Sequence, residues 1–191
     1  MTPPLLLNLL LAFSPAAGFG SVLHDYIEIL LGAPQVVAWA LIVGGIAILL
    51  IERMVQVDRY RGIADIPTVQ ALGIGFIQCI SMVPGVSRSG ATIMGALTLG
   101  VERRTAAEFS FFLAIPTMLG ATALELVKKG DQVTSAQVGW GSIALGLAVS
   151  FIVALLVIRW FVGLVSRQGF GPFAWYRIVA GVAALVWLNL R

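Results

Sequence analysis

The segment Pro84–Thr92, PGVSRSGAT, separates two short apolar runs and constrains the fold more than any other part of the chain. The runs Thr68–Val83 and Gly90–Val101 contain about 16 and 12 residues. As helices they would measure roughly 24 and 18 Å, whereas the hydrocarbon core of a membrane is about 30 Å thick. The second run is therefore too short to cross. Together they predict a re-entrant helical hairpin over about residues 68–101, whose irregular tip must face a cavity or be buried in protein.

The composition predicts an integral membrane protein. The 191 residues are 59% hydrophobic and 11% charged, against about 25% charged in soluble domains. Five further apolar stretches are expected to cross the membrane: about Leu5–Leu23, Val36–Ile51, Thr105–Val127, Gly139–Val165 and Phe173–Leu190. The sequence thus predicts an all-α, polytopic fold of about five transmembrane helices plus one re-entrant hairpin, forming a single integral membrane domain over residues 1–191.

The distribution of basic residues predicts an orientation. A polar connector over Glu52–Asp65, the ends of the hairpin and a turn at residues 168–172 are expected on one side, and a polar loop over Lys128–Gln137 on the other. Six arginines fall on the first side: Arg53, Arg59, Arg61, Arg103, Arg104 and Arg167. Because Lys and Arg are enriched in cytoplasmic loops, this side is expected to face the cytoplasm. No basic run of the kind that binds nucleic acid occurs, so no nucleic-acid partner is expected.

The side chains of the hairpin tip suit a phosphate group. Arg88 offers a planar fork of donors, and Ser87, Ser89 and Thr92 offer hydroxyl donors. Gly85 lets backbone N–H groups approach an anion closely, and the second half-helix points its positive end at the tip. The alternative is that Arg88 is a structural charge on helix-end carbonyls and that the hydroxyls bond to nearby carbonyls.

Three polar residues near the tip have open roles. Gln78, one turn before the motif, either orients a phosphate or a water, or bridges two helices. Glu108 is either a partner for Arg88 or another site cation, or a solvated acid that caps its helix. Arg177, in the last apolar stretch, is expected to snorkel or to pair locally.

The stretch Gln78–Thr92, QCISMVPGVSRSGAT, resembles the second signature of the undecaprenyl-pyrophosphate phosphatases, the bacitracin-resistance membrane family. The resemblance implies hydrolysis of undecaprenyl diphosphate to undecaprenyl phosphate and inorganic phosphate, which recycles the lipid carrier of peptidoglycan synthesis and gives bacitracin resistance. It also implies a multi-pass protein of the bacterial inner membrane with an inverted-repeat fold. By residue match, the diphosphate-binding set would be Gly85, Ser87, Arg88, Ser89 and Thr92, with Gln78 nearby. Arg88, Ser87 and Ser89 would be catalytic: the guanidinium would stabilise charge and a serine would position or attack the phosphoryl group.

One departure from the family pattern affects the expected cofactor. Family members have an earlier repeat with a Glu-x-x-x-Glu signature and a Pro-x-Ser-Ser-x-Gly-His segment, and nothing in this sequence matches it. The chain is therefore expected to lack the N-terminal portion of the family fold. The resemblance implies a divalent cation, Mg²⁺ or Ca²⁺, whose ligands would lie in that portion, since no metal ligands are identifiable in this chain with its one His and one Cys.

Other functions remain open at this stage. Re-entrant hairpins also suit a lipid-phosphate transporter or flippase. A third alternative is an inactive fragment that needs the missing first repeat. The expected partners are a polyprenyl diphosphate substrate and membrane lipids, and a homodimer is left open.

Overall fold

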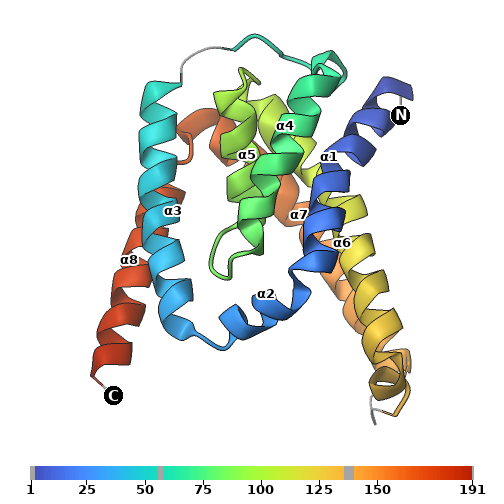
Figure 1. Cartoon of the computed structure of the whole chain (residues 1–191). Helices are drawn as coiled ribbons and strands as arrows, with labels where there is room; N and C mark the ends of the chain where they lie inside the picture. Colours follow the sequence, from blue (N-terminus) through green and yellow to red (C-terminus); the bar gives the residue numbers. More distant parts are fainter. Residues whose placement is uncertain (1–2, 56–57, 136–139, 191) are drawn as a thin grey trace.

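The computed structural model describes the backbone of residues 3–55, 58–135 and 140–190. This part of the chain is all-α, apart from an isolated bridge between Tyr60 and Val101. The helices are α1 (Pro3–Val22), α2 (His24–Leu31), α3 (Pro34–Met54), η1 (Ile63–Asp65), α4 (Thr68–Gln78), η2 (Cys79–Met82), α5 (Arg88–Thr98), α6 (Arg103–Ser135), α7 (Trp140–Gln168) and α8 (Gly171–Asn189). Figure 1 shows their arrangement.

Five helices in the described residues are long and apolar enough to cross a membrane, which confirms the polytopic all-α fold. They are α1, α3, α6, α7 and α8. The expected loop over Lys128–Gln137 is wrong in its first part, because α6 continues to Ser135. Lys and Gln are good helix formers, and the one glycine, Gly130, costs a helix only about 1 kcal/mol. The rest of that expectation, residues 136–137, lies outside the described residues.

The two short apolar runs form the expected helical hairpin. α4 begins after Pro67, continues into η2 and reaches a tip at residues 83–87, from which α5 returns beside it (Figure 1). The two arms pack closely where Gly95 of α5 faces Ile77 of α4: a Cβ added at Gly95 would lie 2.9 Å from Cγ2 of Ile77. The absence of a side chain at Gly95 thus allows the close approach of the arms.

Residues 58–67 of the connector, the open ends of the hairpin and the turn before α8 lie at the same end of the molecule (Figure 1). This confirms the expected grouping of these segments, while the assignment of that end to the cytoplasm stays a prediction. Glu52, near the end of α3, contacts two neighbouring segments: its Oε1 accepts a hydrogen bond of 2.7 Å from the Phe170 N–H in the turn and lies 3.3 Å from Nη2 of Arg103 at the start of α6.

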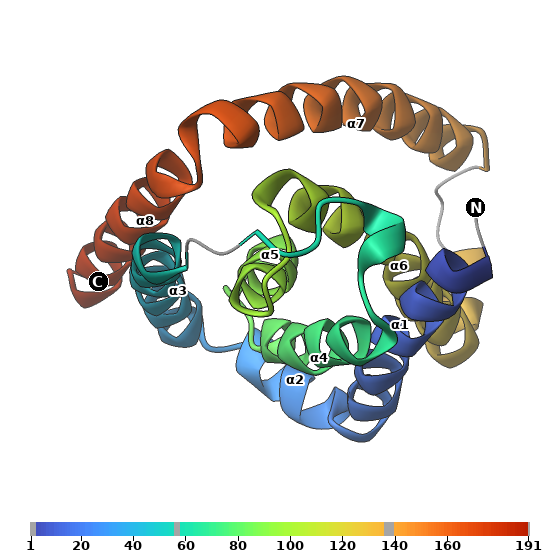
Figure 2. The same ribbon diagram turned by 90° about the horizontal axis from the view of Figure 1, so that it is seen from above.

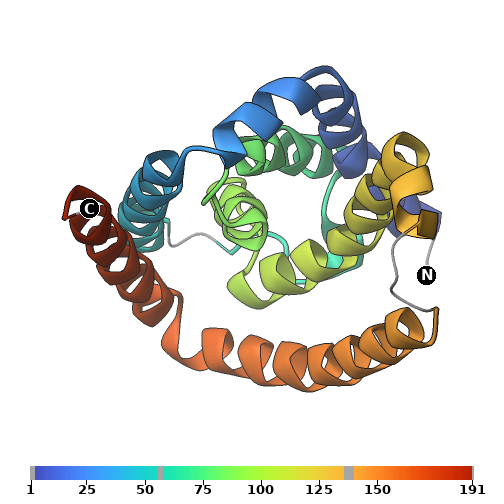
Figure 3. The ribbon, with the colours of Figure 1, turned by 90° about the horizontal axis from the view of Figure 1, so that it is seen from below.

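Helices α3 and α8 pack side by side through glycines (Figures 1 and 2). A Cβ added at Gly45 of α3 would lie 2.8 Å from the carbonyl oxygen of Ala174, and one at Gly181 of α8 would lie 2.8 Å from that of Ala38. Small residues at a membrane helix interface let the two backbones approach closely. Viewed from below, α7 curves along the outside of the other helices and joins α6 to this pair (Figure 3). The α3–α8 pair forms a wall that faces the hairpin.

Candidate functional site: the hairpin tip and an apolar cavity

The tip of the hairpin turns at Gly85, which has a φ of +91°. An L-residue with a side chain rarely adopts this left-handed region, whereas glycine does so without strain. Gly85 also lies against the backbone of α3, where an added Cβ would be 2.6 Å from the carbonyl oxygen of Val37. The glycine in the P-G-x-S-R-S segment is thus required both by the turn and by the approach of the tip to α3.

Ser87 is the N-cap of α5. Its Oγ accepts a hydrogen bond of 3.1 Å from the Gly90 N–H and lies 3.2 Å from Oγ of Ser89. A serine at this position satisfies one of the N–H groups that a helix leaves free at its start. The two hydroxyls therefore lie together at the positive end of α5, where an anion is favoured.

Arg88 follows as the first residue of α5 and is partly buried. Its Nη1 donates a hydrogen bond of 3.1 Å to the main-chain carbonyl of Ser110 in α6. Among the ion pairs of the described residues, none joins this guanidinium to a carboxylate. The charge is held in place by a neutral group, so an anionic ligand would meet a cation that no carboxylate of the described residues neutralises.

Thr92 and Gln78 lie inside the protein, each 1% exposed. The Thr92 hydroxyl contacts the carbonyls of Arg88 and Ser89 and the hydroxyl of Ser110, so it joins α5 to α6. The Gln78 Nε2 is 3.5 Å from Oγ1 of Thr117 in α6, and its buried Oε1 has no partner. Gln78 thus bridges two helices, one of the two roles that the sequence left open for it. The ligand contacts of Gln78 and Thr92 stay predictions.

Glu108 pairs with Arg104, whereas the sequence left open a pairing with Arg88 or another site cation and a role as a solvated acid that caps its helix. Its Oε1 is 2.9 Å from Nε of Arg104, one turn earlier in α6, in a largely exposed pair. Glu108 therefore has a cation partner, but that partner is Arg104 and not Arg88. The reason is the register of the helix, because residues four apart lie on the same helix face.

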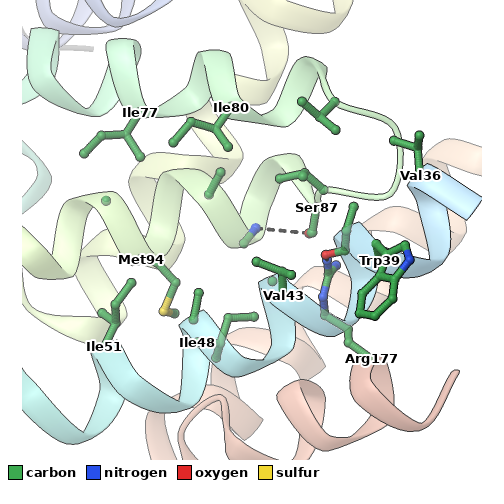
Figure 4. Close-up of a pocket in the computed structure, with 18 of the residues that line it drawn as sticks. Val36, Trp39, Val43, Ile48, Ile51, Ile77, Ile80, Ser87, Met94 and Arg177 are labelled. Carbon is green, nitrogen blue, oxygen red and sulfur yellow. Dashed lines mark hydrogen bonds between the residues drawn. The ribbon is translucent and has the colours of Figure 1, made fainter. Parts of the chain in front are cut away.

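An apolar cavity of about 780 Å³ adjoins the tip (Figure 4). Its walls are α3 and the two arms of the hairpin, and the apolar side chains that line it include Trp39, Val43, Ile48, Ile77, Ile80 and Met94. Ser87 of the tip and Gly90 in the first turn of α5 are also part of the lining, whereas Arg88, Ser89 and Thr92 are not among the lining residues. The cavity thus places apolar walls next to the hydroxyl and helix start of the tip, an arrangement that fits a molecule with an apolar body and an anionic end.

Arg177 of α8 is a cation at this cavity, and the expectation that it snorkels or pairs locally is wrong. The side chain lines the cavity, and the residue is only 5% exposed (Figure 4). Its Nη2 donates a hydrogen bond of 2.9 Å to the Gly85 carbonyl and lies 3.4 Å from that of Ala40. It turns inward because α8 packs on α3, which a local sequence pattern does not reveal. The available signal is the cost of placing an arginine among apolar residues.

The described side chains do not fit a divalent cation. Among them, no three His, Cys, Asp or Glu residues come together. The tip contributes hydroxyls and a guanidinium but no carboxylate, and carboxylates are the usual protein ligands of Mg²⁺ and Ca²⁺. We therefore derive no reaction step through a metal ion.

Comparison with known proteins agrees with the motif. The family model described as "Bacitracin resistance protein BacA" matches residues 2–183. A protein of Novosphingobium aromaticivorans named undecaprenyl-diphosphatase is 62% identical over 186 residues, which are 96% of this chain and 69% of that protein. Its namesake from Rhizorhabdus wittichii is 59% identical over 96% of this chain and 68% of its own length. Undecaprenyl-diphosphatase 1 of Mesorhizobium japonicum is 46% identical over the whole chain and 70% of its own length. The chain belongs to the bacitracin resistance protein BacA family.

Proposed function

We propose that this chain hydrolyses undecaprenyl diphosphate to undecaprenyl phosphate and inorganic phosphate. The relatives described above are named for this activity, and the family model covers nearly the whole chain. The observation that most supports the proposal is the junction of the tip with the apolar cavity at Ser87 and Gly90. A lipid diphosphate has the same two parts, an anionic head and an apolar tail.

The reaction assigns a role to each group of the tip. A water molecule adds to the terminal phosphorus, the bond from that phosphorus to the bridging oxygen breaks, and the monophosphate leaves with the bridging oxygen. Arg88 stabilises the charge that develops on the transferred phosphoryl group. Ser87 and Ser89, whose hydroxyls lie 3.2 Å apart, position that group. Attack by one of these serines on phosphorus is the less favoured alternative.

The cavity receives the part of the isoprenoid tail nearest the head. At about 780 Å³ it has the size of a small-molecule pocket, so most of a C55 chain remains in the surrounding lipid. We also propose that the protein lies in the bacterial inner membrane, contributes to bacitracin resistance and forms a single integral membrane domain.

A divalent cation and a homodimer are further proposals. Chelation with EDTA, followed by readdition of Mg²⁺ or Ca²⁺, would test the need for the cation.

Phosphate release by the purified chain in detergent tests the proposal. The chain is incubated with undecaprenyl diphosphate, and the full-length Novosphingobium aromaticivorans relative serves as the positive control for the assay. Release that depends on Arg88 supports hydrolysis, because hydrolysis needs no sealed bilayer. Translocation of the lipid in liposomes without phosphate release would instead establish a flippase. Absence of both activities, in an assay where the relative is active, would establish an inactive fragment.

A further inference from the structure

We infer that Arg177 is a positioning residue that fixes the hairpin tip against α3. The inference starts from the partners of its guanidinium. Nη2 donates to the carbonyl of Gly85, which lies 92 positions away in the tip, and approaches the carbonyl of Ala40 in α3. One side chain of α8 thereby links the tip to the helix that forms the opposite wall of the cavity.

The surroundings of the side chain hold it in this position. The guanidinium carbon lies 5.9 Å from the centre of the Phe173 ring, one turn earlier in α8, within the range of a cation–π contact. Gly44 of α3 provides the space on the other side, since a Cβ there would lie 2.7 Å from Nη2. The guanidinium thus fits between an aromatic ring and a glycine, in one orientation.

The bonding of the guanidinium separates this arrangement from an ordinary buried ion pair. No carboxylate of the described residues pairs with Arg177, and its buried Nε has no hydrogen-bond partner. A buried arginine is costly unless its donors are used. Here Nη2 is used on two main-chain carbonyls, one of them in the tip, so the cation stabilises the position of a backbone segment.

The position of the tip determines the position of the reacting groups. Gly85 is two residues before Ser87 and three before Arg88, and the backbone between them is outside any helix. A shift of the Gly85 carbonyl therefore moves the start of α5 and with it the predicted catalytic side chains of Ser87, Arg88 and Ser89. Arg177 acts through these residues and its importance for turnover rests on the proposed function.

The test compares Arg177→Met, Arg177→Lys, Gly44→Ala and, as a control, Gly146→Ala of α7, where an added Cβ has no atom within 4 Å. Hydrogen exchange of the peptide 83–90 reports the fixation of the tip, and phosphate release gives kcat and KM. Arg177→Met is expected to speed exchange of this peptide by about tenfold or more, the effect of losing one charged hydrogen bond. It is expected to lower kcat by about tenfold or more and to change KM less than about threefold, since the contact is to the tip and not to the lipid tail.

The other variants separate positioning from mere stability. Arg177→Lys keeps a charged donor and is expected to recover part of both losses. Gly44→Ala improves the helix propensity of α3 yet displaces the guanidinium, so kcat is expected to fall without a lower melting temperature. The inference is overturned if hydrogen exchange of the peptide 83–90 in Arg177→Met equals that of the unmodified chain, or if kcat is unchanged. If the unmodified chain releases no phosphate while tip exchange still responds to Arg177→Met, the proposed function fails and the contact itself is upheld.

Discussion

Replacing Gly85 with alanine tests whether the shape of the tip governs activity. The added Cβ would lie 2.6 Å from the carbonyl oxygen of Val37 and 2.8 Å from its Cα, both in the backbone of α3. Ordinary contact begins near 3.4 Å, so the tip must move by about 0.8 Å or α3 must yield. A displacement of about 1 Å at an active site costs turnover by about 10²-fold. We therefore expect kcat to fall by about that factor.

The matched control for this substitution is Gly100→Ala. Gly100 has a φ of +85°, close to the +91° of Gly85, so both alanines pay a similar backbone strain of about 1–2 kcal/mol. At Gly100, however, the nearest atom to an added Cβ is the Cδ of the long Arg59 side chain at 3.4 Å. Thermal unfolding and phosphate release are measured for both variants. Both are expected to melt earlier, and only Gly85→Ala should lose kcat by two orders of magnitude. A similar loss in Gly100→Ala, or near-normal kcat in Gly85→Ala, would show that the argument from tip position is mistaken.

Three further substitutions test separate parts of the site. Arg88→Ala is expected to lower kcat by about 10²-fold, the effect of losing one strong donor to a developing charge, and near-normal phosphate release would defeat the assignment. Ser87→Ala removes the cap of α5 and is expected to reduce stability by about 0.5–2 kcal/mol in thermal or denaturant unfolding; an unchanged transition would contradict the role of the Gly90 contact. Ala47→Phe narrows the cavity from its α3 wall. It is expected to raise KM for undecaprenyl diphosphate by about tenfold with kcat retained, because burial of roughly two CH₂ groups of the tail is lost, at about 0.8 kcal/mol each; an unchanged KM would place the tail elsewhere.

The hairpin was predictable because its causes are local. Two apolar runs too short to cross, a proline before the first and a serine before the second are enough to predict helix, turn and helix. The placement of Ser87 at the start of α5 follows from the same residues. The pairing of Glu108 with Arg104 was also available, since residues four apart on a helix are neighbours. The polar residues from Lys128 onward predict a loop, but they continue α6 to Ser135 because Lys and Gln are good helix formers.

The inward position of Arg177 was not predictable from its own neighbourhood. Its partner is 92 positions away, and the contact exists only because α3 and α8 pack closely at glycines. The apolar cavity has the same origin, since its walls come from α3 and from the hairpin. Local patterns indicate which residues are costly to bury, but which segments meet is determined by long-range packing.

Arg88 and Arg177 are both held in place by main-chain carbonyls. Arg88 donates to the carbonyl of Ser110 and Arg177 to that of Gly85, and neither is paired with a carboxylate of the described residues. Main-chain carbonyls fix the position of a guanidinium without cancelling its charge. Arg177 lines the cavity, whose other walls are largely apolar, whereas Arg88 is not among the lining residues and directly follows Ser87, which is. In such apolar surroundings charges interact more strongly than in water. An anionic headgroup that reaches the Arg88 guanidinium would supply the missing negative charge, so binding of a lipid diphosphate is expected to stabilise the folded chain as well as to precede its hydrolysis.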